Sequence, residues 1–130
     1  MDAELQALVD AARAVRERAH APYSKFRVGA ALVTASGEVF TGANVENASL
    51  GLTLCAERTA MSAAVSAGHR AFTRIVIVTQ RDEAIQPCGA CRQFLAEFAS
   101  DLEVVAVGES GVVDTRTLQQ LLPGQFALED

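Results

Sequence analysis

Three cysteines and one glutamate are the residues of this chain whose types and spacing point most directly to chemistry. The sequence contains three cysteines. Cys55 precedes Glu57 by two positions, and Cys88 and Cys91 are separated by Gly-Ala and follow a proline. We expect both cysteine sites at the starts of helices, where the positive N-terminus lowers the pKa of a thiol and favours the thiolate that binds metal. Three protein ligands and one water are the arrangement of a catalytic zinc, whereas a structural zinc takes four protein ligands.

Glu57 is the candidate general base of such a site. It lies too close in sequence to Cys55 to coordinate the same metal easily, but it is well placed to take a proton from a bound water. Zinc lowers the pKa of that water to about 7, and a carboxylate within hydrogen-bond reach can carry the proton. His20 and His69 are expected to be solvated residues at helix ends and not metal ligands.

Other interpretations of the cysteines remain open at this point. A C-x-x-C pair alone also fits a redox pair or two buried cysteines, and a C-x-E sequence alone carries little information. An odd number of cysteines does not suit the disulfide framework of a secreted protein. The combination of all three cysteines with Glu57 at two helix starts on one sheet edge favours a metal site.

Charge argues against a polynucleotide ligand. The chain has 11 Lys and Arg against 16 Asp and Glu, a formal net charge of −5, and Lys25 is its only lysine. Phosphate backbones are bound by clustered basic residues, which this composition does not offer.

Length and hydropathy predict one cytoplasmic domain. With 130 residues, half of them hydrophobic, the chain can build a single core, and we expect one domain over residues 1–130. The longest apolar runs, such as residues 28–33, fall far short of the roughly 20 residues that span a bilayer. The first residues mix acids into a helical pattern, so no signal segment is expected.

Hydrophobic periodicity predicts the elements that must position these residues. Helices are expected over residues 4–20, 55–67 and 89–98, with one helical turn over 117–122. Strands are expected over residues 26–34, 39–45, 74–80, 103–107 and 112–115, with a loop over 44–54. This order predicts an α/β fold in which a mixed sheet is covered by helices on both faces.

With these residues in place, the sequence resembles the zinc-dependent nucleoside and nucleic-acid deaminases, in the form with a Cys₃ zinc site, a non-ligand Glu and a P-C-x-x-C signature. Within that class it is similar to the small homotetrameric cytidine deaminases. The resemblance is carried by Ala21–Phe26, Asn44–Asn47, Cys55–Ala60, Pro87–Gln93 and Leu121–Gly124.

The resemblance implies a three-layer α/β/α fold with a five-stranded mixed sheet and one Zn²⁺ per subunit, held by Cys55, Cys88 and Cys91. It implies hydrolytic deamination of cytidine and 2′-deoxycytidine to the uridines and ammonia, in pyrimidine salvage. Glu57 would take the water proton, deliver it to ring N3 and help the amino group leave.

The resemblance also implies a set of substrate contacts. Asn44 and Glu46 would bind the ribose 3′-hydroxyl, and alternating residues at a strand end project to the same side, as one sugar requires. Phe26 would stack on the base, although such a residue also fits an ordinary strand core. The backbone amide of Ala56 at a helix N-terminus would contact the substrate. Tyr23 is a candidate for the pocket edge.

Two further residues are expected to tune the metal. Three thiolates and Zn²⁺ sum to a charge of −1, which makes the metal a poorer Lewis acid. An arginine donating to the sulfurs draws charge back. The resemblance assigns that role to Arg58, with Gln93 as a second candidate, while an exposed helix arginine is the alternative for Arg58.

The resemblance further implies a homotetramer with active sites at subunit interfaces. Phe126 matches an aromatic residue that reaches into a neighbouring subunit's site, although a residue near a chain end also packs locally. Leu50 departs from the pattern, because many relatives carry tyrosine there, near a subunit contact with the ligand.

Three other functions fit the sequence less well than nucleoside deamination. A deaminase of a cytosine-nucleoside antibiotic is disfavoured because the ribose-binding set Asn44, Glu46 and Asn47 is intact. Editing of RNA or DNA is disfavoured by the net charge, and by a last pair of strands expected to be antiparallel. A structural zinc module would need a fourth protein ligand.

Overall fold

Four helices, one 3₁₀ turn and five strands form the fold of residues 1–128, the part of the chain described by the computed structural model. The elements are α1 (Ala3–Arg16), β1 (Gly29–Thr34), β2 (Val39–Ala43), the 3₁₀ turn η1 (Leu50–Leu52), α2 (Ala56–Ser66), β3 (Phe72–Val78), α3 (Gly89–Ala96), β4 (Glu103–Val107), β5 (Val113–Thr117) and α4 (Leu118–Leu121).

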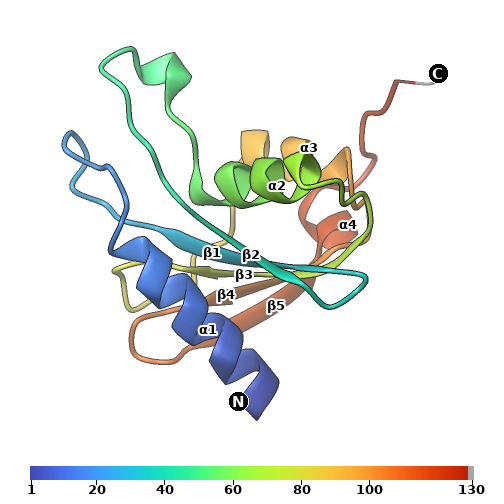
Figure 1. The fold of residues 1–130 in the computed structure, drawn as a ribbon, viewed down its shortest axis with the longest axis horizontal. Helices are drawn as coiled ribbons and strands as arrows, with labels where there is room; N and C mark the ends of the chain where they lie inside the picture. Colours follow the sequence, from blue (N-terminus) through green and yellow to red (C-terminus); the bar gives the residue numbers. More distant parts are fainter. Residues whose placement is uncertain (129–130) are drawn as a thin grey trace.

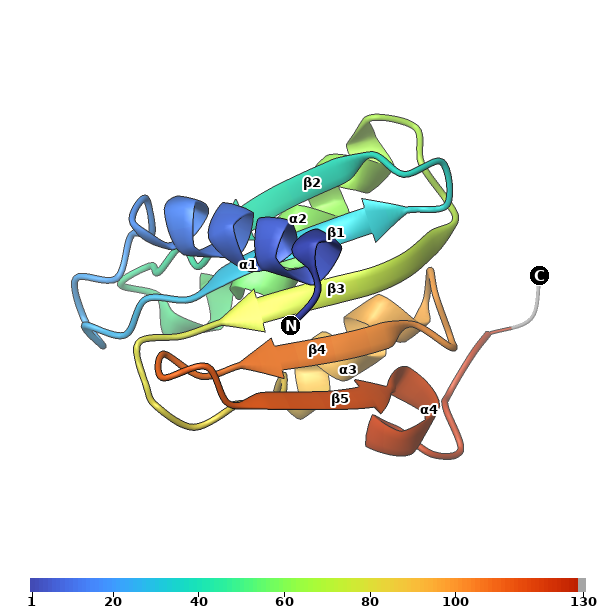
Figure 2. The ribbon, with the colours of Figure 1, turned by 90° about the horizontal axis from the view of Figure 1, so that it is seen from below.

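The strands form one mixed sheet in the order β2-β1-β3-β4-β5. β1 pairs antiparallel with β2 and β3, β3 and β4 are parallel, and β5 pairs antiparallel with β4. Figure 1 shows α2 and α3 on one face of the sheet and α1 on the other, and Figure 2 shows α1 lying across the strands. The predicted three-layer fold with a five-stranded mixed sheet is confirmed.

The two faces of the central strands explain their continuous apolar sequences. Strands buried on both faces lack polar alternation, and successive side chains enter opposite layers. In β3, Ile75 and Ile77 belong to the core beneath α2 and α3, whereas Val76 and Val78 belong to the core beneath α1. All four side chains are at most 2% exposed.

The first predicted helix and the first predicted strand are both shorter than expected. α1 ends at Arg16, and His20 pairs its backbone with the segment after β2, accepting from Glu46 N at 2.8 Å. β1 begins at Gly29 because the preceding backbone is bound by a side chain, with Val28 N donating to Asn44 Oδ1 at 2.9 Å. The apolar pattern used to predict the strand contains no sign of this side-chain hydrogen bond, so the predicted strand was too long.

α2 lies unusually close to β2. A Cβ atom on Gly42 would stand 2.4 Å from Ala60 N and 2.8 Å from Ala56 O, so only glycine allows this approach. The contact holds the first turn of α2, and with it Cys55 and Glu57, against the sheet edge.

The connection from β2 to α2 projects away from the body of the molecule (Figure 1). It carries three exposed leucines, Leu50, Leu52 and Leu54. Among residues 1–128, no helix has both the length and the apolar character needed to cross a bilayer.

Candidate active site

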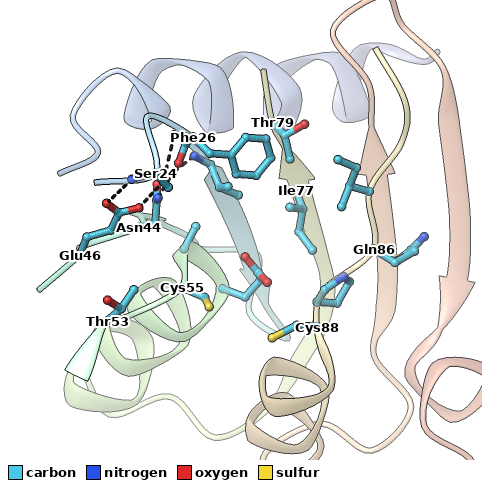
Figure 3. Close-up of a pocket in the computed structure, with 15 residues that line it drawn as sticks. Ser24, Phe26, Asn44, Glu46, Thr53, Cys55, Ile77, Thr79, Gln86 and Cys88 are labelled. Carbon is cyan, nitrogen blue, oxygen red and sulfur yellow. Dashed lines mark hydrogen bonds between the residues drawn. The ribbon is translucent and has the colours of Figure 1, made fainter. Parts of the chain in front are cut away.

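The three cysteine sulfurs come together where two helices begin. Cys55 is the N-cap of α2 and Cys88 is the N-cap of α3, with Cys91 in the first turn of α3. An N-cap residue and the third helical residue face each other across one turn, the geometry also used by a capping box. The three Sγ atoms lie within 4.8 Å of one another. Figure 3 shows Cys55 and Cys88 facing the same space from their two helices.

This donor set fits zinc. Three thiolates bound at 2.3 Å to one tetrahedral ion lie about 3.8 Å apart, so only a small contraction of the cluster is needed. Within residues 1–128 it is the only group of three potential metal-ligating side chains that lies this close together. Three protein donors leave the fourth tetrahedral position for a ligand from outside the chain, as in catalytic sites.

Two thiols of the cluster, Cys55 and Cys91, have pKa values shifted in opposite directions. A hydrogen bond from Cys91 lowers the pKa of Cys55 to about 5, with a further contribution from Arg58. The same hydrogen bond and burial raise the pKa of Cys91 above its ordinary range. In the metal-free cluster, the thiolate form is therefore favoured at Cys55 and disfavoured at Cys91.

Arg58 lies beside the cluster. Its Nη2 donates to Cys55 Sγ at 3.5 Å and to the carbonyl oxygen of Thr53 at 3.0 Å. The two bonds aim the guanidinium at a sulfur and not at solvent. The structure thus places Arg58 where it can withdraw charge from a thiolate.

Glu57 is a buried carboxyl group in the first turn of α2. It is 5% exposed and lines the same cavity as Cys55 and Cys88. Burial raises the pKa of Glu57, and the negative charge of Cys55 raises it further. A carboxyl group with a raised pKa binds a proton more readily than a solvated carboxylate, which suits a proton acceptor.

A cavity of about 300 Å³ opens next to the cysteines and Glu57. This volume is at the lower end of small-molecule sites. Seven of the residues predicted for the site line it: Phe26, Asn44, Glu46, Cys55, Ala56, Glu57 and Cys88. Figure 3 shows Cys55 and Cys88 at one end of the cavity and Phe26, Asn44 and Glu46 toward the other.

Glu46 is held by the loop that precedes β1. The backbone N–H groups of Tyr23 and Ser24 donate to Glu46 Oε1 at 3.0 and 3.1 Å. The Ser24 hydroxyl donates to the other carboxylate oxygen and accepts from Phe26 N at 3.0 Å. The Ser24 hydrogen bond lowers the pKa of Glu46, so this carboxylate stays ionised.

Asn44 holds the backbone on both sides of Arg27. Its Nδ2 donates to the Phe26 carbonyl oxygen at 2.8 Å, and its Oδ1 accepts from Val28 N at 2.9 Å. The side chain is therefore part of the cavity wall and also fixes the backbone that carries Phe26 (Figure 3).

Phe126 and Gln93 lie apart from the cavity lining. Gln93 Nε2 donates to the carbonyl oxygen of Phe126 at 3.1 Å, which ties the C-terminal segment to α3. The Phe126 side chain is 67% exposed. In a single chain, neither residue reaches the space beside Glu57.

Several lining residues were not predicted from the sequence. Thr79 follows β3 directly, and pockets of open α/β sheets lie beyond the carboxyl ends of parallel strands, so its position was a usable signal. Ser24 and Gln86 lie in loops, and no periodic pattern marks such residues. Gln86 Nε2 donates to the Asp114 side chain at 3.0 Å, which joins the loop before Cys88 to β5.

Comparison with known proteins agrees with this geometry. Residues 2–107 match the family model described as the cytidine and deoxycytidylate deaminase zinc-binding region. The chain is 52% identical over 128 residues to a probable cytidine deaminase of Dictyostelium discoideum, covering 98% of this chain and 86% of that protein. It is 47% identical over 126 residues to a cytidine deaminase of Halalkalibacterium halodurans, covering 96% of each.

A solved structure shows the same fold. The crystal structure of cytidine deaminase from Burkholderia pseudomallei superposes with a TM-score of 0.91 at 50% sequence identity. The superposition covers 97% of this chain and all of the other.

Proposed function

The chain belongs to the cytidine and deoxycytidylate deaminase family, and on that premise we propose that it hydrolyses cytidine to uridine and ammonia, with 2′-deoxycytidine as a second substrate. One observation carries the proposal: a Cys₃ cluster and a buried glutamate share one cavity of nucleoside-compatible size. We place the reaction in pyrimidine salvage.

Cys55, Cys88 and Cys91 would hold a zinc ion, which would supply a Lewis acid that lowers the pKa of a water molecule to about 7. Glu57 would accept a proton from that water as the water oxygen bonds to C4 of the pyrimidine, and would deliver the proton to ring N3. The second water proton, passed on through Glu57, would let the amino group leave as ammonia as the C4–N bond breaks. Burial suits Glu57 to this role because it raises the pKa of the carboxyl group and so strengthens its hold on a proton.

Arg58 offsets the charge of the thiolate ligands. Three thiolates and Zn²⁺ carry a net charge of −1, and the contact with Cys55 Sγ brings a full positive charge to that group. Withdrawal of sulfur charge strengthens the Lewis acidity that the reaction needs. Gln93 is a second candidate for this role, but its side chain would have to move to reach the sulfurs, because its amide donates to the Phe126 carbonyl oxygen.

The remaining cavity residues are assigned to the nucleoside. Glu46 and Asn44 bind the ribose 3′-hydroxyl, and the lowered pKa of Glu46 supports its role as an ionised acceptor. Phe26 stacks on the pyrimidine, and the first N–H of α2 at Ala56 contacts the base, as helix N-termini can.

Direct assay tests the proposed function. Purified zinc-loaded protein is incubated with cytidine, 2′-deoxycytidine, a cytosine-nucleoside antibiotic and a cytosine-containing single-stranded oligonucleotide, and ammonia release is measured. We expect turnover of the first two. Turnover of the antibiotic or the oligonucleotide without turnover of cytidine would contradict the proposal.

We further propose a cytoplasmic protein with a single domain over residues 1–130. Three free cysteines suit a reducing compartment. One sheet with helices on both faces accounts for the elements of residues 1–128. Nucleosides are the proposed partners, because a net charge of −5 offers no polynucleotide surface.

We also propose a homotetramer whose subunits complete each other's sites. Leu50 and Leu52 are 73% and 65% exposed on the projecting connection after β2, which suits contact with another subunit. Phe126 is exposed and lies outside the cavity of its own chain, so a neighbour's cavity is its proposed place.

Phe126→Ala tests this arrangement. We expect a KM for cytidine about 10-fold higher, the size of one lost base–aromatic contact, with zinc content unchanged. Leu128→Ala is the matched control, because Leu128 is similarly exposed on the same segment.

Co-expression of the Phe126→Ala chain with a Glu57→Gln chain then shows whether Phe126 acts in the cavity of a neighbouring subunit or in that of its own chain. In mixed oligomers, some cavities combine an intact Glu57 with a neighbour's intact Phe126, and wild-type KM should return in them. A fully active monomer in size-exclusion chromatography with light scattering would refute the arrangement.

A further inference from the structure

Arg92 binds two backbone carbonyl groups from different parts of the chain. Its Nε donates to the Pro87 oxygen at 2.7 Å, and its Nη1 donates to the Leu121 oxygen at 2.8 Å. Arg92 directly follows Cys91 in α3. We propose that Arg92 is a positioning residue of the metal centre, which fixes the turn carrying Cys88 so that its sulfur meets the other two.

The Pro87 carbonyl has no donor from the helix that follows it. The first backbone bond of α3 runs from Arg92 N to the Cys88 carbonyl at 3.0 Å, one residue further along. Pro87 is buried, and a buried carbonyl without a donor is unfavourable. The Arg92 guanidinium supplies that donor, and with it a fixed orientation of the peptide between Pro87 and Cys88.

Cys88 is the ligand that depends most on this turn. Cys91 is buried within α3, and Cys55 is fixed by the close packing of α2 on β2. Cys88 is exposed, and as an N-cap residue it has non-helical backbone angles and no side-chain capping bond. Rotation of the Pro87 peptide therefore moves the Cys88 sulfur directly.

The second bond of Arg92 anchors the guanidinium itself. Leu121 is the last residue of α4, and the terminal carbonyls of a helix lack donors within it. Arg92 thus bridges the end of α4 and the turn before α3. A guanidinium offers several donors in one rigid plane, whereas a lysine ammonium is a point charge on a flexible chain.

Arg92→Gln and Arg92→Lys test this role through zinc affinity, without substrate. Metal-free protein competes for Zn²⁺ with a chromophoric chelator. We expect the dissociation constant of Arg92→Gln to rise by about 10-fold to 100-fold, as for other groups that orient metal ligands. The dissociation constant of Arg92→Lys should lie between those of Arg92→Gln and the wild type, because the lysine ammonium can bind one of the two carbonyl groups but not both.

Arg70→Gln is the matched control. Arg70 also donates to two backbone carbonyls, those of Val65 and His69, both at 2.9 Å, but it lies at the other end of α2 from Cys55. Its zinc affinity should equal that of the wild type.

Two outcomes would overturn the proposal. One is a wild-type zinc dissociation constant in Arg92→Lys and, if it folds by circular dichroism, in Arg92→Gln. The other is an equal loss of affinity in Arg70→Gln, which would indicate general destabilisation. Because no nucleoside is present, these outcomes are independent of whether cytidine is the substrate.

Discussion

Glu57→Gln is expected to lower kcat for cytidine by about 10⁴-fold, the upper range for a lost general acid–base group. Glutamine keeps the size of the side chain but cannot accept and return a proton. Because Glu57 is not a proposed zinc ligand, zinc content should stay at one ion per chain. Metal analysis and an ammonia-release assay on the same sample measure both quantities.

The control for this variant is Glu97→Gln, an exposed glutamate at the C-cap of α3. It should retain wild-type kcat and zinc content. Wild-type turnover in Glu57→Gln would contradict the assigned mechanism, whereas joint loss of zinc and activity would assign Glu57 to the metal site.

The raised pKa of Glu57 also predicts how this variant changes stability. A carboxyl whose folded-state pKa is raised contributes stability below its unfolded pKa of about 4.3, and this contribution is lost as pH rises through the folded value. Burial is the cause of the shift. Glutamine does not ionise, so its variant does not lose stability as pH rises. At neutral pH the Tm of metal-free Glu57→Gln should therefore equal or exceed that of the metal-free wild type.

Removal of zinc is expected to abolish deamination completely. A chelator removes the metal, and one equivalent of Zn²⁺ per chain should restore activity, whereas Mg²⁺ should not, because thiolates are soft ligands and Mg²⁺ prefers oxygen. Restoration by Mg²⁺, or activity that survives removal of the metal, would contradict the Cys₃ site.

The same metal-free sample reports the state of the thiols. With its pKa lowered to about 5, Cys55 is a thiolate at neutral pH and should be alkylated there, while buried Cys91 with a raised pKa should react slowly. Peptide mapping by mass spectrometry measures both rates. Added zinc should protect Cys55, and equal rates at Cys55 and Cys91 would contradict the predicted charge distribution.

The sequence allowed the layers of this fold and the metal cluster to be predicted for the same reason. Apolar runs such as residues 75–78 indicate burial on both faces, and two cysteine sites at helix starts favour a shared sheet edge. Both inferences depend on local patterns whose geometry is regular. Residues 55, 57, 88 and 91 accordingly meet in the structure as expected.

The parts not predicted depend on side chains that bind distant backbone. The Asn44 side chain binds the backbone before β1, where a strand partner was expected. The loop that carries Ser24 binds the Glu46 carboxylate, and Arg92 joins the turn before Cys88 to α4. Their partners are set by tertiary packing, and no sequence period encodes them. The position of Phe126 could not be predicted from local sequence patterns either, because its side chain is exposed in the single chain.

The division of the zinc ligands between two helix starts has a consequence for the rate of unfolding. Cys55 follows β2 and the Cys88–Cys91 pair follows β3, and β1 lies between those two strands and pairs with both, so the sheet holds the three sulfurs together. An unfolded chain offers at most the local pair, which holds zinc far less well than three fixed thiolates. Bound zinc should therefore slow unfolding, because it links two separate βα connections of the sheet.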